Sequence, residues 1–219
     1  MTNGYLYCVY SDNGQPNKFF HNEFLVSFKS LKKVLPHCQV SLYTNIEFEN
    51  TFGIDNIIFD PDIDRNHICK ATGLLKSPYQ KTIVLDTDTV IHRDVIDSIF
   101  TVLNDFNFTC CHGNWWASGE IYPDLNTGLI GVKKNEFTDE QINKWIHNHK
   151  KHKFKSDQKS FRNIFLENKK EFYILPAYFM YRWYHYKDYP NQAVLSHDHN
   201  MSKTKITNKI IKSFQEQRN

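Results

Sequence analysis

Residues 82–91 read TIVLDTDTVI, a nonpolar run that ends on two aspartates one residue apart. The stretch 82–85 is apolar or β-branched throughout, as expected of a central strand that is covered on both faces. Asp86 and Asp88 follow where such a strand ends, and burying two carboxylates there is costly without a compensating cation. Two carboxylate oxygens suit a hard divalent ion such as Mg²⁺ or Mn²⁺, with positions left for phosphate oxygens and water.

Strand-like and helix-like segments alternate on both sides of this run. Apolar periodicity, turn residues and helix caps predict strands at 5–10, 39–44, 56–59, 108–111 and 129–132, and helices at 21–35, 67–76, from Thr138 and from Asp157. This order predicts an α/β fold with a Rossmann-like, largely parallel central sheet flanked by helices. Ligands then bind at the edge where the strands end, which is where Asp86 and Asp88 lie.

Length and composition limit the classes of protein. With 219 residues, 40% hydrophobic and 23% charged, the chain is expected to form a single domain over 1–219, with 202–219 as a terminal helix or tail. No run approaches the roughly 20 apolar residues of a spanning helix, and no secretory signal is recognisable. Lys and Arg total 27 against 24 Asp and Glu, which gives no reason to expect a nucleic-acid partner.

The five cysteines are odd in number and have no C-x-x-C spacing. This predicts reduced, mostly buried thiols in a reducing compartment. We therefore expect a cytoplasmic protein, and a viral protein or a piece of a longer enzyme fits the same pattern.

Two classes of enzyme place such carboxylates after a buried strand. Nucleotide-sugar glycosyltransferases use a D-x-D pair to hold a metal and the donor's diphosphate. Haloacid-dehalogenase-type phosphatases have a D-x-D-x-T/V motif, which residues 86–90 match by letter, with Asp86 as the nucleophile. The phosphatase motif begins its domain, however, whereas three strand-like runs precede it here. A nucleotide-sugar-binding protein without catalysis would also keep the pair.

The segment 70–91, with ATGLLKSP at 71–78 followed by the aspartate pair, resembles GT-A fold glycosyltransferases of the family 8, glycogenin and bacterial galactosyltransferase type. Further blocks similar to that family follow its order and cover most of the chain: YSD at 10–12, LNTGLIGV at 125–132, DQ at 157–158 and VLSH at 194–197. The chain departs from the family after the late histidine, where DHNMSK replaces the usual glycine and lysine pattern. It is also short, so its acceptor-binding part must be small.

The resemblance implies a metal-dependent enzyme that moves a hexose-type sugar from a UDP-sugar to a hydroxyl of a carbohydrate acceptor, with retention at the anomeric carbon. It implies Mn²⁺, or Mg²⁺, held by Asp86, Asp88 and His197, with His199 as the competing ligand. A divalent ion of this kind stabilises the negative charge of the leaving diphosphate.

The resemblance also implies roles for other residues. The donor would be bound by Tyr10, Ser11, Asp12, Asp62, Lys70, Asp86, Thr87, Asn126 and Gly128, with Tyr10 stacking on the uracil ring. The catalytic candidates are Asp157 and Gln158, with Asp124 and Glu120 as a general base if the enzyme inverts. Trp115 and Trp116 could form an acceptor platform. Structural roles as helix caps, turns or core aromatics stay open for several of these residues.

Overall fold

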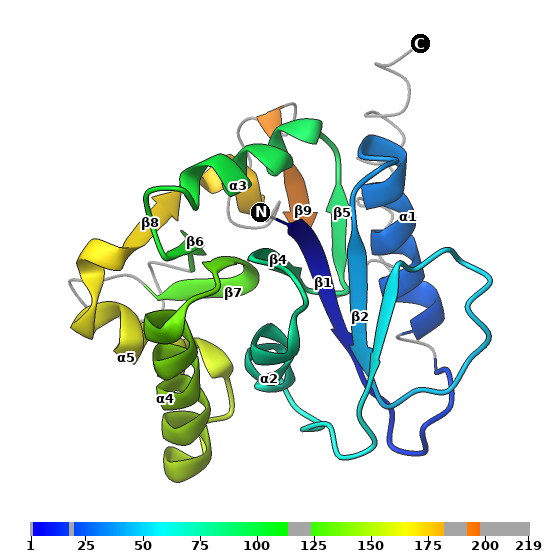
Figure 1. Ribbon diagram of the computed structural model, residues 1–219, viewed down its shortest axis with the longest axis horizontal. Helices are drawn as coiled ribbons and strands as arrows, with labels where there is room; N and C mark the ends of the chain where they lie inside the picture. Colours follow the sequence, from blue (N-terminus) through cyan, green and yellow to red (C-terminus); the bar gives the residue numbers. More distant parts are fainter. Residues whose placement is uncertain (1, 18–19, 114–123, 182–191, 198–219) are drawn as a thin grey trace.

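A seven-stranded sheet forms the centre of the protein (Figure 1). The computed structural model describes residues 2–17, 20–113, 124–181 and 192–197. Within them the strand order is β3-β2-β1-β4-β7-β6-β8. These strands are β1 (Asn3–Val9), β2 (Val40–Thr44), β3 (Asn56–Phe59), β4 (Lys81–Leu85), β6 (Phe108–His112), β7 (Leu125–Lys133) and β8 (Phe172–Leu175).

Strand β7 runs opposite to its neighbours. The pairs β1–β2, β2–β3, β1–β4 and β6–β8 are parallel, whereas β7 is antiparallel to both β4 and β6. Leu85, the last residue of β4, pairs with Leu129. The first residues of β7 therefore lie at the same edge of the sheet as the last residues of β1 and β4. The largely parallel sheet predicted from the sequence is confirmed, with this one reversal.

Helices cover both faces of the sheet (Figure 1). They are the π-helix η1 (Phe20–Phe24), α1 (Leu25–Val34), α2 (Cys69–Lys76), α3 (Ile99–Val102), α4 (Glu136–His152) and α5 (Asp157–Glu167), with the short 3-10 helices η2 (Asp94–Ser98), η4 (Lys169–Glu171) and η5 (Ala177–Met180). Tyr5 and Tyr7 of β1 pack on the side of α1, while Leu6 packs on the side of α2 and α4. This alternation explains why the central strands are apolar at nearly every position.

A second, two-stranded sheet lies beside the first. It joins β5 (Thr89–Ile91) to β9 (Leu195–His197) in antiparallel pairing, with Thr89 opposite His197. Because β5 begins three residues after Asp86, this small sheet brings the late part of the chain against the end of β4.

The start of α4 differs from the sequence prediction. Thr138 was expected to cap the helix, but the helix begins at Glu136 with Asn135 as its N-cap. The Asn135 side chain accepts a hydrogen bond from the Thr138 amide at 3.0 Å, and the Thr138 hydroxyl accepts one from the Asn135 amide at 3.0 Å. Thr138 is thus the second partner of the capping box rather than its first. The predicted cap of α5 is confirmed, since Ser156 accepts from the Gln158 amide.

All five cysteines lie in the described residues and are free thiols. Cys69, Cys110 and Cys111 are buried, and Cys8 and Cys38 are half-buried. Among the described helices, none has the length and apolar character needed to cross a membrane.

Candidate metal and nucleotide site

The carboxylate pair lies in the turn that joins β4 to β5. Asp86 follows the buried strand directly, and Thr87 and Asp88 form the turn. The side chain of Asp86 is 27% exposed and that of Asp88 is 13% exposed, so both reach the surface without being freely solvated. The apolar run of β4 thus delivers two carboxylates to one edge of the sheet, as the sequence predicted.

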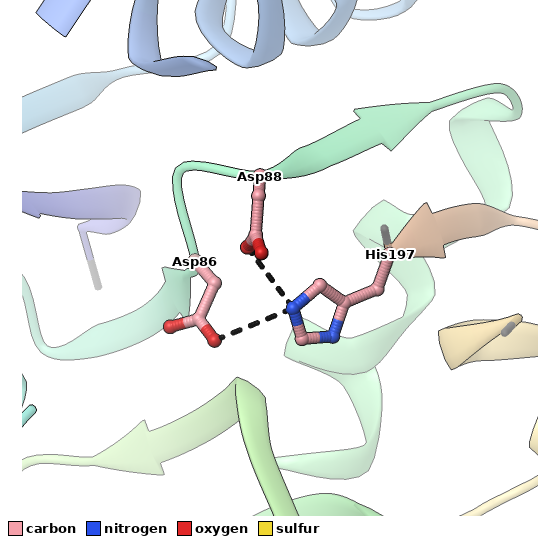
Figure 2. Close-up of side chains that lie close together, drawn as sticks. All are labelled: Asp86, Asp88 and His197. Carbon is pink, nitrogen blue, oxygen red and sulfur yellow. Dashed lines mark ion pairs between the residues drawn. The ribbon is translucent and has the colours of Figure 1, made fainter. Parts of the chain in front are cut away.

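His197 at the end of β9 faces both carboxylates (Figure 2). Its Nε2 atom lies 3.0 Å from Asp88 Oδ1 and 3.7 Å from Asp86 Oδ2, and the imidazole side chain is 1% exposed. One ligand atom from each residue lies within 4.8 Å of the others. A nitrogen and two carboxylate oxygens gathered in this way form a donor set that fits a divalent cation.

Gly128 makes room for this group of side chains. A Cβ atom at this position would lie 2.9 Å from Asp86 Oδ2 and 3.0 Å from His197 Cε1. Asn126, buried in β7, accepts a hydrogen bond from the Gly128 amide at 2.7 Å. The antiparallel β7 therefore supplies a close-fitting wall, which only a residue without a side chain allows.

A buried lysine links two of the predicted site carboxylates. Lys70 of α2 lies with its Nζ 2.6 Å from Asp86 Oδ1 and 3.4 Å from Asp157 Oδ2, and it donates to the Thr127 main-chain oxygen at 3.0 Å. Burial by itself disfavours the ammonium charge, but the carboxylates of Asp157 and Asp86 outweigh this and raise the pKa of Lys70. Lys70 therefore stays charged and holds α5 close to the end of β4.

Asp157 is held at the start of α5 through its main-chain oxygen. This oxygen accepts hydrogen bonds from Trp145 Nε1 at 3.1 Å and from Ser160 Oγ at 2.9 Å. The Asp157 side chain is buried, and its Oδ2 has no hydrogen-bond partner among the described residues, although Lys70 lies nearby. Gln158, the next residue, is half-buried.

A pocket of about 350 Å³ adjoins the carboxylate turn. It is lined by Cys8, Val9, Tyr10, Ser11, Asp12, Asn17, Glu23, His67, Cys69, Lys70, Leu85, Asp86, Thr87 and Asp88. The predicted loop after β1 is thus part of the same pocket as the carboxylate pair. The side chain of Asn45 fixes this loop. Its Oδ1 accepts a hydrogen bond from the Ser11 main-chain amide at 3.0 Å, and its Nδ2 donates one to the Ser11 main-chain oxygen at 2.8 Å. Burial raises the pKa of Tyr10, so its ring stays neutral.

Other candidates lie away from this pocket. Asp62 is exposed in the loop after β3 and does not line the pocket. Asp124 is half-buried just before β7, where its main-chain oxygen accepts from Gly113, and no hydrogen bond within the described residues joins its carboxylate to the cluster. The candidates Trp115, Trp116, Glu120 and His199, and the predicted tail 202–219, lie outside the described residues.

Glu23 was missed by the sequence analysis. It lies in the π-helix η1, lines the pocket, and accepts a hydrogen bond from the Thr87 hydroxyl at 3.3 Å. Single π-helical turns occur often at functional sites. The sequence offered no signal for it beyond one acidic residue near the start of an expected helix, because only the packing of η1 brings it to the carboxylate turn.

Several solved structures with a similar fold are glycosyltransferases. The chain aligns with GlyE of Streptococcus pneumoniae TIGR4 at a TM-score of 0.73 and 12% identity, covering 97% of this chain and 60% of GlyE. It aligns with the galactosyltransferase LgtC, in complex with donor and acceptor sugar analogs, at a TM-score of 0.65 and 13% identity, covering 98% of this chain and 96% of LgtC. A glycosyltransferase involved in glycosylation of the major capsid of PBCV-1 aligns at a TM-score of 0.60 and 14% identity, covering 99% of this chain and 100% of that protein.

These comparisons confirm the GT-A fold predicted from the sequence. No family model matches the sequence, and no curated protein matches it. The chain spans 60% of the length of GlyE.

Proposed function

We propose that the protein is a divalent-metal-dependent glycosyltransferase that moves a hexose from a UDP-sugar to a hydroxyl group of a carbohydrate acceptor. The observation that carries this proposal is the group formed by Asp86, Asp88 and His197, of which the two aspartates line the pocket. The fold of glycosyltransferases supports it, as does the similarity to LgtC, whose structure holds donor and acceptor sugar analogs.

Asp86, Asp88 and His197 would hold the cation. Their mixed oxygen and nitrogen donors favour Mn²⁺ over Mg²⁺, because Mg²⁺ prefers oxygen ligands throughout. His197 must be neutral at Nε2 to act as a ligand. When bound, the cation stabilises the charge that develops on the departing diphosphate.

The pocket would hold the nucleoside end of the donor. Tyr10 offers an aromatic face for the uracil ring, and Ser11 and Asp12 offer polar groups for its edge or for the ribose. Among the described residues that line this pocket, four carry carboxylates (Asp12, Glu23, Asp86 and Asp88) and one, Lys70, carries an ammonium group. A diphosphate would be repelled by such a lining unless a cation accompanies it.

Transfer breaks the bond between the anomeric carbon and the diphosphate oxygen, so that the nucleoside diphosphate leaves, and forms a bond from the anomeric carbon to the acceptor oxygen, whose proton passes to the departing diphosphate. Asp157 and Gln158 are our candidates for the reacting face of the sugar, and Asn126 and Gly128 for its ring. Lys70 keeps Asp157 near the cation site. We propose retention at the anomeric carbon, with Asp124 as a candidate base in an inverting enzyme.

The phosphatase alternative has less support. Its nucleophile would be Asp86, whose Oδ1 is held by Lys70 at 2.6 Å and whose Oδ2 faces His197. The strand that ends just before Asp86 also follows three other strands of the same sheet. The same pocket would also suit a protein that binds a nucleotide sugar without catalysis. Only a measurement of turnover distinguishes that function from the enzyme.

A donor-hydrolysis screen tests the proposal. UDP-, GDP- and dTDP-sugars are incubated with the protein, with and without Mn²⁺, and the released nucleotide is measured. We expect release of UDP that depends on Mn²⁺. Tight binding of UDP-sugars without any turnover on a panel of carbohydrate acceptors would favour the binding protein, and release of inorganic phosphate from simple esters would favour the phosphatase.

A further inference from the structure

A row of buried hydroxyl groups leads from the central sheet to the carboxylate turn. The Tyr7 hydroxyl lies 2.9 Å from Ser27 Oγ, and Ser27 Oγ lies 2.9 Å from Thr89 Oγ1. Thr89 Oγ1 in turn donates to the main-chain oxygen of Asp86 at 2.7 Å. Tyr7, Ser27 and Thr89 are all 0% exposed. The row therefore connects three elements, β1, α1 and β5, to the residue that carries the first carboxylate.

The direction of every hydrogen bond in this row follows from counting protons. A hydroxyl group has one proton to donate, and a carbonyl oxygen can only accept. Because Thr89 uses its proton on Asp86, Ser27 must donate to Thr89. Tyr7 must then donate to Ser27. The row is a one-way chain with each buried proton in use, so loss of one member leaves the next without its donor.

A second serine fixes β5 against α1. The Ile91 amide donates to Ser30 Oγ at 2.9 Å, and Ser30 Oγ donates to the Ser27 main-chain oxygen at 2.7 Å. Ser27 and Ser30 are three residues apart and so lie on one face of the helix. They hold the two ends of β5, whose first residue Thr89 pairs with His197. The helix thus sets the position of the strand that the histidine-bearing β9 joins.

We propose that Thr89, Ser27 and Tyr7 are positioning residues that hold the carboxylate turn in the shape that binds the divalent cation. Thr89 closes the turn from its fourth residue back to its first, Asp86, and Asp88 lies between them. The inference rests on the proposed function, because it concerns the same cation. Groups that hydrogen-bond behind metal ligands typically alter metal affinity about 10- to 100-fold when they are removed.

The variant Thr89→Val tests this directly, because valine keeps the shape of threonine but has no hydroxyl. Titration with Mn²⁺ alone, followed by calorimetry or by the electron paramagnetic resonance signal of free Mn²⁺, is expected to show affinity weakened about 10-fold or more. Thr89→Ser keeps the hydroxyl and is expected to bind Mn²⁺ nearly as the wild type does. Ser27→Ala and Tyr7→Phe interrupt the chain further back and are expected to show progressively smaller losses.

Thr82→Val is the matched control. Thr82 lies at the other end of β4, is buried, and shares a hydroxyl hydrogen bond of 2.6 Å with Ser77. The variant Thr82→Val makes the same chemical change in β4, the strand that directly precedes Asp86. It is expected to lower the melting temperature without changing Mn²⁺ affinity. The contrast separates positioning of the turn from general loss of stability.

The outcomes are distinct. Equal Mn²⁺ affinity of the wild type and Thr89→Val, or an equal loss in Thr82→Val, would overturn the positioning role while leaving the proposed function intact. If Thr89→Val does not fold, Ser27→Ala and Tyr7→Phe decide the question, and unchanged affinity in both would overturn it. Failure of the wild type to bind Mn²⁺ would instead remove the metal site, and the proposed function with it.

Discussion

Asp86 and Gly128 are joined across the β4–β7 pair by a main-chain hydrogen bond of 2.9 Å from the Asp86 amide to the Gly128 oxygen. The absent side chain of Gly128 leaves the space that Asp86 Oδ2 and the His197 ring occupy. Two segments more than forty residues apart thus shape the candidate cation site together.

Substitution of Gly128 by alanine is expected to damage this site specifically. The new Cβ would lie about 3 Å from both Asp86 and His197, closer than such contacts normally allow. We expect Mn²⁺ affinity to fall about 10-fold or more. Gly53→Ala is the control, because its Cβ meets no atom within 4 Å but its φ of +77° strains an alanine. That variant should lose stability and keep Mn²⁺ affinity; equal Mn²⁺ binding by both variants would contradict the prediction.

Removal of one carboxylate is expected to abolish the metal dependence of the reaction. Asp88→Asn keeps the size of the side chain but removes a charge that faces His197. Release of UDP from a UDP-sugar should fall about 100-fold or more. Chelation should inactivate the wild type, and added Mn²⁺ should restore it but not the variant. Asp94→Asn, at an exposed position in η2, should behave as the wild type; a Mn²⁺ response retained by Asp88→Asn would argue against this cation site.

Loss of Lys70 is expected to destabilise the fold strongly. Lys70→Met leaves the buried carboxylate of Asp157 without the cation beside it. Breaking a buried pair from one side typically costs about 3–5 kcal/mol of unfolding free energy. Urea denaturation measures this loss. The double variant Lys70→Met, Asp157→Asn should recover part of it, because the buried charge of Asp157 is then removed, while Asp86, the other partner of Lys70, is 27% exposed. A double variant no more stable than the single one would contradict the charge argument.

Asp60 is expected to make stability depend on pH in the acid range. Its carboxylate accepts hydrogen bonds from Lys76 Nζ at 2.6 Å and from the Tyr43 hydroxyl at 2.5 Å, which hold its pKa below the ordinary value of 3.8. A lowered folded-state pKa means that this contribution is present above pH 3.8 and is lost as pH falls through the folded value.

The variant Asp60→Asn measures this contribution. Unfolding free energies from urea denaturation should differ between wild type and variant by up to about 1 kcal/mol at pH 7, since Lys76 is partly exposed. The difference should shrink as the pH is lowered below 3.8. A difference that is constant with pH would mean that the lost hydrogen-bond geometry, rather than the carboxylate charge, accounts for it.

Local sequence patterns predicted the strands and helices that build the sheet. Apolar runs and helix caps are local properties of a sequence. The strand that ends before Asp86 and the Ser156 cap of α5 could therefore both be predicted. The predicted start of α4 at Thr138 was wrong because Asn135 and Thr138 can each cap a helix, and the backbone decides that Asn135 is the N-cap and that the helix begins at Glu136. The role of Glu23 was not predicted for a related reason: no sequence pattern relates it to Thr87, which it contacts only in the folded protein.

The sequence by itself determined that two carboxylates follow a buried strand. A strand covered on both faces needs an apolar run, and the charged side chains of Asp86 and Asp88 mark where that run ends. The family resemblance named His197 and Gly128 as candidates, but only the tertiary structure brings them against the two carboxylates. The reversed direction of β7 brings Gly128 beside Asp86, and the pairing of β5 with β9 brings His197 within 3.0 Å of Asp88. Such contacts depend on strand order and register between segments that are about forty to more than a hundred residues apart, and no short-range pattern along the chain encodes them.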